Sequence, residues 1–254
     1  MSIRIRHPRL LGLLVFALVL GALTAPIVAG KQKSSQSFAQ AELFVELNDT
    51  DGDLGFHAAI DGGTWTLLQV HDPSGRPLLG IESSGRLRSQ GLTQLAFESQ
   101  EPSFDELDPA MFFRRFPEGI YEIEALAQGG GTFRNQVRFS HVLAAPPQAT
   151  VNGQPAVPCD APVLPVALSP VLIDWEPVTE SHPEIGKKGP VKISRYQFFV
   201  EQGDTKLSMD LLPTVTEFEI PTSITSAGGI WKFEIIARTS ANNNTAIESC
   251  FKMQ

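Results

Sequence analysis

The sequence predicts an all-β protein built from two tandem antiparallel β-sandwiches, and three observations support this prediction. A glycine followed by a strand that alternates apolar and charged residues occurs at 119–125 and again at 229–235. The two copies are 110 residues apart, about the length of one sandwich domain. Short alternating segments fill most of the chain, and 21 glycines and 19 prolines supply the turns between them.

The first 29 residues have the pattern of a secretory signal peptide. Arg4, Arg6 and Arg9 form a basic start, residues 10–23 are apolar, and cleavage is expected after Ala29. The alternative is an uncleaved anchor, because the apolar character continues almost far enough to span a bilayer. We therefore expect a secreted or periplasmic protein that meets a membrane only if this segment is retained.

The chain after residue 29 is acidic, with 17 basic against 28 acidic residues. Binding to nucleic acid requires clustered lysine and arginine on the protein. A nucleic-acid partner is therefore not expected.

The chain has two cysteines, Cys159 and Cys250. In an oxidising compartment they can form a disulfide that closes a loop of about 90 residues. Two unpaired buried thiols are the alternative. A metal site at the cysteines is the least expected outcome, because two isolated cysteines lack the paired spacing of zinc ligands.

Turn and strand signals divide the chain into a first domain at 39–143, a proline-rich linker at 144–158 and a second domain at 159–254. In the first domain, separate strands are expected at 56–60 and 65–70, on either side of Gly62 and Gly63. Ser103 and Glu106 form a capping box, which predicts one short helix between 103 and 117. A hairpin is expected around the glycines at 129–131.

Four segments of the second domain, at 173–177, 193–198, 215–220 and 229–238, follow one another with the order and spacing of known strands. Together they resemble the fibronectin type III domain over about 90 residues. Trp231 departs from that family, which usually has tyrosine there. Residues 181–190 also lengthen the loop before the third strand.

The first domain resembles immunoglobulin-like domains more generally. Residues 116–121 are similar to the tyrosine corner of such sandwiches, and Trp65 lies where they often bury a tryptophan. Residues 47–55 are similar to a stretch of uncharacterised secreted bacterial proteins that carry this pairing of domains. These resemblances imply a role in binding or spacing and bring no activity with them.

Asn48, Asp49, Asp51 and Asp53 are the candidate metal ligands. Acidic residues at alternate positions, with a glycine that bends the chain, can surround Ca²⁺ with oxygen atoms. The spacing does not match an EF-hand, because the sixth and twelfth positions counted from Asp49 are Leu54 and Ile60. The alternative is a plain hairpin turn, for which Asp-Gly is a leading signal. No other cofactor is expected.

The sequence favours a non-enzymatic protein. It contains no Gly-x-Ser-x-Gly nucleophile elbow, and its glycine runs lack the lysine of a phosphate-binding loop. We expect a secreted or periplasmic interaction or scaffold protein with a protein or cell-envelope partner. The alternative is a calcium-stabilised accessory or carbohydrate-binding module, although Trp65, Tyr121, Trp175 and Trp231 are expected in the core, where they cannot stack on sugars.

Overall fold

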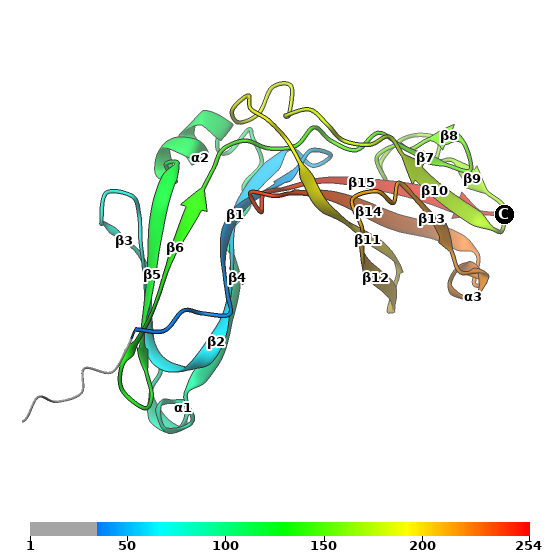
Figure 1. The fold of residues 1–254 in the computed structure, drawn as a ribbon. Coiled ribbons are helices and arrows are strands. Elements are labelled where there is room, and N and C mark those ends of the chain that lie inside the picture. The colour runs from blue at the N-terminus through cyan, green and yellow to red at the C-terminus, as the bar shows by residue number, and fades with distance from the viewer. Residues whose placement is uncertain (1–34) are drawn as a thin grey trace, which may run out of the picture. The chain divides into compact units, whose positions relative to one another are not determined.

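The computed structural model describes residues 35–254, and this part of the chain is all-β, as the sequence predicts (Figure 1). The expected signal peptide at 1–29 lies outside the described residues. The strands form one sheet of eleven strands and one of four. Within residues 35–254, no helix has the length and apolar character needed to cross a membrane.

The buried apolar side chains form two clusters, here called the first core and the second core. The first core extends in sequence from Phe38 to Leu143, and the second from Ala144 to Met253. The elements of this part of the chain are β1 (Gln40–Asn48), β2 (Asp53–His71), β3 (Pro77–Glu82), α1 (Gly85–Gln90), β4 (Leu92–Glu98), α2 (Pro109–Arg115), β5 (Gly119–Ala127) and β6 (Thr132–Phe139). All of them except α1 contribute side chains to the first core.

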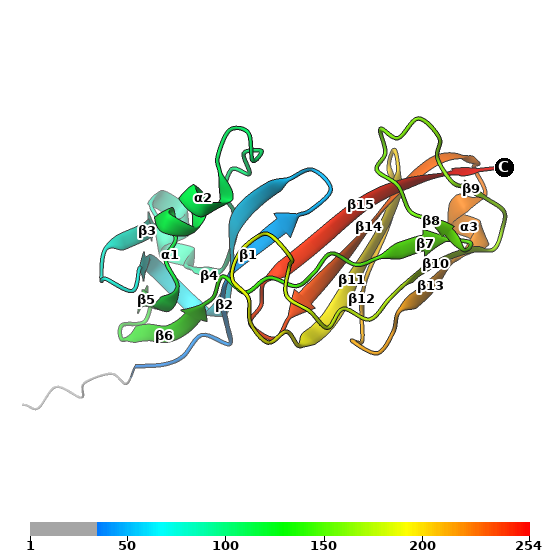
Figure 2. The ribbon, with the colours of Figure 1, turned by 90° about the horizontal axis from the view of Figure 1, so that it is seen from above.

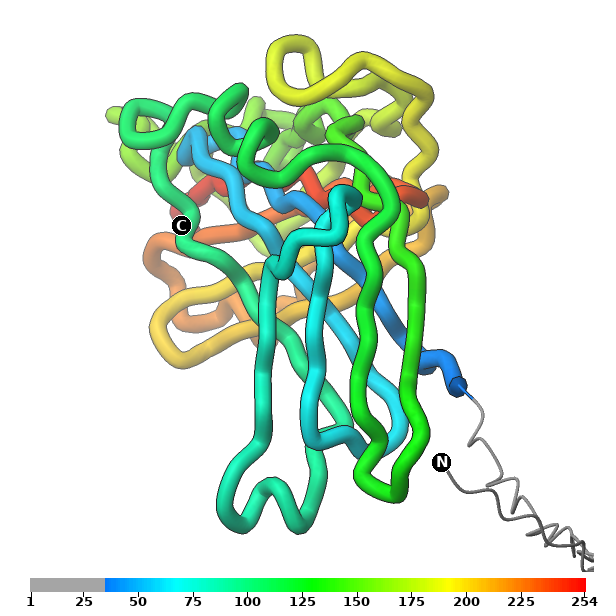
Figure 3. Tube along the Cα trace, turned by 90° about the vertical axis from the view of Figure 1, so that its left-hand side faces the viewer, coloured from blue at the N-terminus to red at the C-terminus, as the bar shows by residue number. Residues whose placement is uncertain are grey.

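β2 is one strand of 19 residues, where the sequence suggested two. Its first half pairs with β1 and β4, and its second half pairs with β3 and β5 (Figure 3). Gly62 and Gly63 lie at the change of partner, where a Cβ would come within 2.9 Å of Phe38 and 2.7 Å of Phe133 respectively. The glycines therefore permit a close approach of aromatic rings instead of ending the strand.

The second core lies between two sheets. The smaller sheet has the strand order β13-β10-β7-β8 and forms a separate layer beside β14 and β15 (Figure 2). β7 and β8 come from the segment expected as a linker. The elements of the second core are β7 (Ala149–Val151), β8 (Gln154–Pro155), β9 (Val166–Ala167), β10 (Val171–Trp175), β11 (Ile193–Gln202), β12 (Thr205–Leu211), β13 (Glu217–Ile220), α3 (Thr222–Thr225), β14 (Gly229–Thr239) and β15 (Asn244–Met253).

The glycine-led sequence repeated at 119–125 and 229–235 marks equivalent positions in the two cores. Gly119 and Gly229 begin β5 and β14, and both have positive φ angles, of 147° and 83°. The Tyr121 hydroxyl donates to the Pro117 carbonyl at 3.0 Å, as in a tyrosine corner. Trp231 takes the corresponding place in the second core, and its indole N–H donates to the Gly228 carbonyl at 3.2 Å. Both rings are fully buried, as expected.

The helices differ from the sequence expectation. Ser103 forms an isolated bridge with Asp53, residues 104–106 form a turn, and α2 begins at Pro109, where the Asp108 side chain accepts from the Ala110 N–H at 2.7 Å. Proline fits the first turn of a helix but not its interior, so the helix begins there. α1 and α3 were not predicted, and neither has a side-chain cap that a sequence pattern would reveal.

The predicted disulfide is present. Cys159, in the segment between β8 and β9, is bonded to Cys250 of β15, with 4.7 Å between the two Cα atoms and a sequence separation of 91. The bond fixes the segment before β9 to the large sheet.

Removing the disulfide with the double substitution Cys159→Ser and Cys250→Ser is expected to lower the free energy of unfolding by about 4 kcal/mol, because a long loop of the unfolded chain is no longer closed. Urea unfolding of both proteins, with and without reductant, measures this. Reductant should destabilise the parent protein and leave the double variant unchanged. Equal stability of the parent protein with and without reductant would contradict the prediction.

Candidate functional site at the junction of the two cores

The two cores share one sheet because β1 of the first core pairs with β15 of the second. The pairing is parallel and joins Glu46 with Asn244, Leu47 with Thr245, and Asn48 with Ala246. β1 and β15 lie next to each other at this junction in Figure 1. The outer face of the sheet is therefore continuous from the first core to the second.

A buried asparagine fastens the junction. The Asn243 side chain is 1% exposed, and its Oδ1 accepts from the Val45 N–H of β1 at 2.9 Å. Its Nδ2 donates to the carbonyls of Ser140 and Val142, at 2.8 and 3.0 Å. One amide thus satisfies three backbone groups that belong to the first core or to the segment leading from it.

The long loop before β11 adds a second attachment. Ile185 of this loop packs against the first core, and the His182 Nε2 lies 2.8 Å from Asp49 Oδ1. The His182 Nδ1 accepts from the N–H groups of Glu184 and Ile185, at 3.2 and 2.8 Å. This pattern assigns the Nε2–H tautomer, with the ring donating to Asp49. The loop that departs from the fibronectin pattern therefore contributes to the junction.

An open hollow of about 350 Å³, here called the sheet-face groove, crosses the junction on the outer face of the large sheet. Residues of β1, β2, β4, β11, β14 and β15 line it. Its charged residues, apart from His57, are Glu42, Glu46, Glu98, Arg195, Glu234 and Arg238.

Arg238 is the central cation of the groove and is 3% exposed. Its guanidinium lies 2.6 Å from Glu42 Oε2 and donates to Asn244 Oδ1 at 3.0 Å. It also lies over the ring of Phe44, 4.5 Å from the centroid. Asn244 in turn donates to Glu46 Oε2 at 2.6 Å. These contacts connect β14 and β15 of the second core to β1 of the first.

His57 continues the polar surface on β2. Its ring stacks on Phe44 with 5.2 Å between centroids, and its Nε2 lies 2.9 Å from Glu101 Oε1. Burial lowers the pKa of His57, but the hydrogen bond with Glu101 and the charges of nearby glutamates outweigh it, so the pKa is raised. The ring therefore gains a proton more readily than a free histidine.

Two carboxyl groups at the groove hold protons unusually tightly. Burial, together with the charges of Glu46 and Glu248, raises the pKa of Glu234 to about 7. Burial also raises the pKa of Glu98, with a further contribution from Glu101. Groups with displaced pKa values often gather at functional sites, although structural charge networks displace them too.

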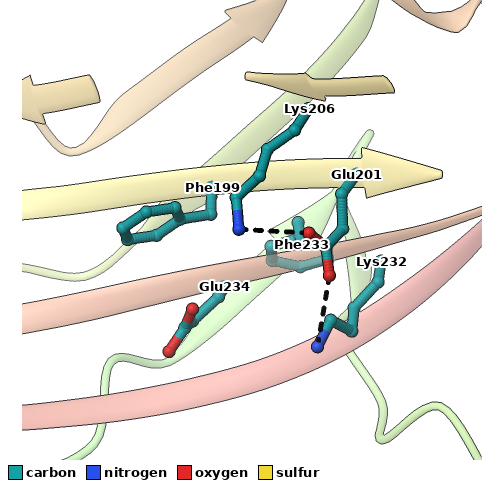
Figure 4. Close-up of a pocket in the computed structure, with 6 residues that line it drawn as sticks. All are labelled: Phe199, Glu201, Lys206, Lys232, Phe233 and Glu234. Carbon is teal, nitrogen blue, oxygen red and sulfur yellow. Dashed lines mark ion pairs between the residues drawn. The ribbon is translucent and has the colours of Figure 1, made fainter. Parts of the chain in front are cut away.

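A smaller hollow of about 90 Å³ adjoins the groove and shares Glu234 and Phe199 with it (Figure 4). Glu201 lies at its centre, 3.3 Å from the Lys206 ammonium and 3.5 Å from that of Lys232. The Glu234 carboxylate has no ion pair in Figure 4. The two lysines are therefore engaged with Glu201, and Lys232 also with Glu248 at 3.2 Å.

The predicted metal ligands lie at the rim of the junction, and Asn48, Asp49 and Asp51 have protein partners. The Asn48 Oδ1 accepts from the N–H groups of Thr50 and Asp51, and Asp49 is paired with His182. Burial and the charges of Glu101, Asp51, Glu248 and Glu46 raise the pKa of Asp53 to about 6. Over the described part of the chain, no three His, Cys, Asp or Glu side chains are grouped so that they could hold a metal ion. The calcium site stays a prediction.

Sequence reasoning did not find the groove. Glu42 and Glu46 alternate with Leu43, Val45 and Leu47, and this pattern indicates a strand with one wet face. The same holds for Glu234 and Arg238 on β14. Alternation in the sequence shows the polar face of each strand. It does not show that β1 pairs with β15, because this pairing joins residues about 198 positions apart.

No protein-family model and no curated protein sequence matches the chain. Among solved structures, the human OSCAR ligand-binding domain matches over 85% of this chain and 100% of its own, at 11% identity and a TM-score of 0.26. Fibronectin(III)-like modules of Clostridium thermocellum CbhA match over 84% and 95%, at 11% identity and a TM-score of 0.26. A tetra-tandem repeat of a large adhesion protein matches over 84% and 50%, at 8% identity and a TM-score of 0.28. Similarities at this level support no argument about function.

Changing Asn243 to Asp is expected to lower the free energy of unfolding by about 3 kcal/mol or more. The substitution removes both donors to the Ser140 and Val142 carbonyls and places a carboxylate in a buried position. Guanidinium unfolding followed by tryptophan fluorescence measures the change.

Asn242→Asp provides the matched control. Asn242 is partly exposed and has a φ of 72°, which aspartate also tolerates. This variant should lie within about 0.5 kcal/mol of the parent protein. Equal effects of the two substitutions would show that the Asn243 amide does not hold the junction.

Proposed function

We propose that the protein is a secreted or periplasmic, non-enzymatic interaction module that presents the sheet-face groove to a protein or cell-envelope partner. Its first module, 39–143, and its second module, 159–254 together with β7 and β8 from 144–158, act as one unit. The observation that carries the proposal is the single outer sheet face that both cores share, fixed by Arg238, Asn243 and Asn244. A preorganised surface loses little conformational entropy on binding.

The chemistry of the groove supports binding more than catalysis. Arg238, Glu42, Asn244 and Glu46 hold one another in hydrogen bonds, and His57 is held by Glu101. Groups fixed in this way orient a ligand well. A nucleophile with an adjacent free base is the arrangement that covalent catalysis requires, whereas Arg238, His57, Glu42 and Glu46 of the groove are held by other protein groups.

The disulfide supports an oxidising location, because such bonds persist outside the reducing cytosol. It agrees with the signal-peptide pattern of residues 1–29. We therefore propose export as part of the same function.

A photo-crosslinking amino acid placed at Gln197, which lines the groove, is expected to capture a partner from the native envelope fraction. The control position is Glu219, which is exposed on β13 of the smaller sheet. The captured partner, identified by mass spectrometry and then purified, should bind the unmodified protein with a measurable Kd. Equal labelling from the two positions, or no binding by the purified partner, would contradict the proposed surface.

A calcium-stabilised accessory module is the second candidate, and the crowding of carboxylates around Asp53 favours it. If Ca²⁺ binds there, it should raise the melting temperature, since a ligand that binds only the folded state adds about 2.7 kcal/mol at a concentration of 100 times Kd. The variant Asp51→Asn should reduce the shift. An unchanged melting temperature in saturating Ca²⁺ would remove this candidate.

The carbohydrate-binding form of the second candidate has less support. Sugar sites commonly use exposed tryptophan or tyrosine rings. All three tryptophans and both tyrosines of the chain lie in the cores and are at most 4% exposed. The described surface therefore offers no tryptophan or tyrosine platform for a sugar.

A further inference from the structure

The sheet-face groove has an excess of negative charge. It is lined by four carboxylates, Glu42, Glu46, Glu98 and Glu234, and by two guanidinium groups, Arg195 and Arg238, which leaves two negative charges when all are ionised. Both cations already have acidic partners. Arg238 is paired with Glu42, and Arg195 lies 3.6 Å from Asp210.

Three groove carboxylates lack a cationic partner. Within residues 35–254, no lysine, arginine or histidine forms an ion pair with Glu46, Glu98 or Glu234. The raised pKa values of Glu98 and Glu234 have the same physical origin, because partly buried negative charge lies close to further negative charge. A cation placed in the groove would relieve this repulsion.

The dimensions of the groove suit a polypeptide. It crosses six adjacent strands, β11-β14-β15-β1-β2-β4, which at a spacing of about 4.8 Å is about 24 Å along the sheet. An extended chain of about seven residues covers that distance at about 3.3 Å per residue. The Phe199 ring at one end is partly exposed and already lies under the Lys206 ammonium, which is 5.5 Å from the ring centroid, so it is suited to contact with a basic side chain.

We propose that the sheet-face groove binds an extended polypeptide segment that carries lysine or arginine residues, aligned across the junction of the two cores. The proposal rests on the proposed function and specifies the chemistry of the partner. The ammonium or guanidinium groups of the segment pair with Glu46, Glu98 and Glu234, while Arg238 and Asn244 keep Glu42 and Glu46 in place.

Binding should strengthen between about pH 6 and about pH 8. The pKa of Glu234 is about 7, so it is mostly neutral at the lower pH and mostly charged at the higher. The charged groups around Glu234 are Glu46 on β1, Glu248 on β15, Lys232 on its own strand and Lys206 on β12. Glu201 of β11 lines the same smaller hollow. The raised pKa of His57 acts in the same direction, because its proton adds positive charge at low pH.

The probe is a fluorescent peptide of about eight residues with lysine at alternate positions in a serine and threonine background. A second peptide of the same design carries glutamate in place of lysine. Fluorescence anisotropy with the mature full-length protein is expected to show binding of the lysine peptide at about pH 8. Affinity should fall several-fold at about pH 6 and should weaken with added salt.

The double variant Glu46→Gln and Glu234→Gln is expected to bind the lysine peptide about tenfold more weakly and to lose most of the pH dependence. Both substitutions keep a side chain of the same shape, and the amide introduced by Glu46→Gln retains an oxygen that can accept from Asn244. Stability supplies a folding check. Folding raises the pKa of Glu234 from its ordinary value of 4.5 to about 7, so its ionisation lowers the stability of the fold progressively between about pH 4.5 and about pH 7, and the full loss is present at pH 8. The variant should therefore be at least as stable as the parent protein at pH 8.

The matched control is Glu217→Gln with Glu219→Gln, which changes the net charge equally on exposed residues of β13. The control variant should bind as the parent protein does. The proposal is overturned if the lysine peptide does not bind, if the glutamate peptide binds equally, or if the control weakens binding as much as the groove variant. If cross-linking at Gln197 then identifies a partner that lacks basic segments, this inference fails while the proposed function stands.

Discussion

The structure depends on one buried amide and on the backbone pairing beside it. Asn243 comes just before β15, and its side chain meets an N–H of β1 and two carbonyls that follow β6. Without that amide, the three backbone groups would be buried next to β15 with no equivalent partner, and each unpaired group costs free energy. Because they are satisfied, β1 can approach β15 closely enough to form the parallel ladder of three residue pairs.

This ladder joins the strands of two separate cores into one continuous sheet face. Tandem sandwiches connected by a linker alone would present two faces whose relative orientation varies, and a ligand that touched both would have to fix that orientation at an entropic cost. Here the second core's Arg238 reaches Glu42 of the first core and Asn244 reaches Glu46. The contacts that hold the junction are thus also the contacts that shape the groove.

Much of the fold was accessible from the sequence because it is local. The glycine-led repeat located β5 and β14 and the buried rings of Tyr121 and Trp231, and alternation located most of the other strands. The disulfide followed from the presence of two cysteines in a chain whose first residues predict export. The start of α2 was misplaced because Asp108 caps the helix in place of Ser103, and both residues carry an oxygen suited to that role.

The candidate site was not accessible in the same way. Glu42, Glu46, Glu234 and Arg238 each resemble the solvent-facing residues of an ordinary amphipathic strand, and period-two alternation cannot show which strands will be neighbours. The loop at 181–190 looked like a simple insertion. Its role depends on two long-range contacts: His182 lies beside Asp49, and Ile185 packs against the first core. Long-range pairing decided all of these positions.

The distribution of lysines explains why Glu234 stands out. Lys232 and Lys206 are close enough to lower its pKa, yet their ion pairs are with Glu201 and, for Lys232, with Glu248. Glu234 directly opposes Glu248 across the β14–β15 ladder, a pairing of like charges that destabilises a sheet. A glutamine at this position would avoid that repulsion and keep the shape of the side chain. The carboxylate therefore costs folding stability, and departures of this kind from the stability optimum are expected at functional sites of natural proteins.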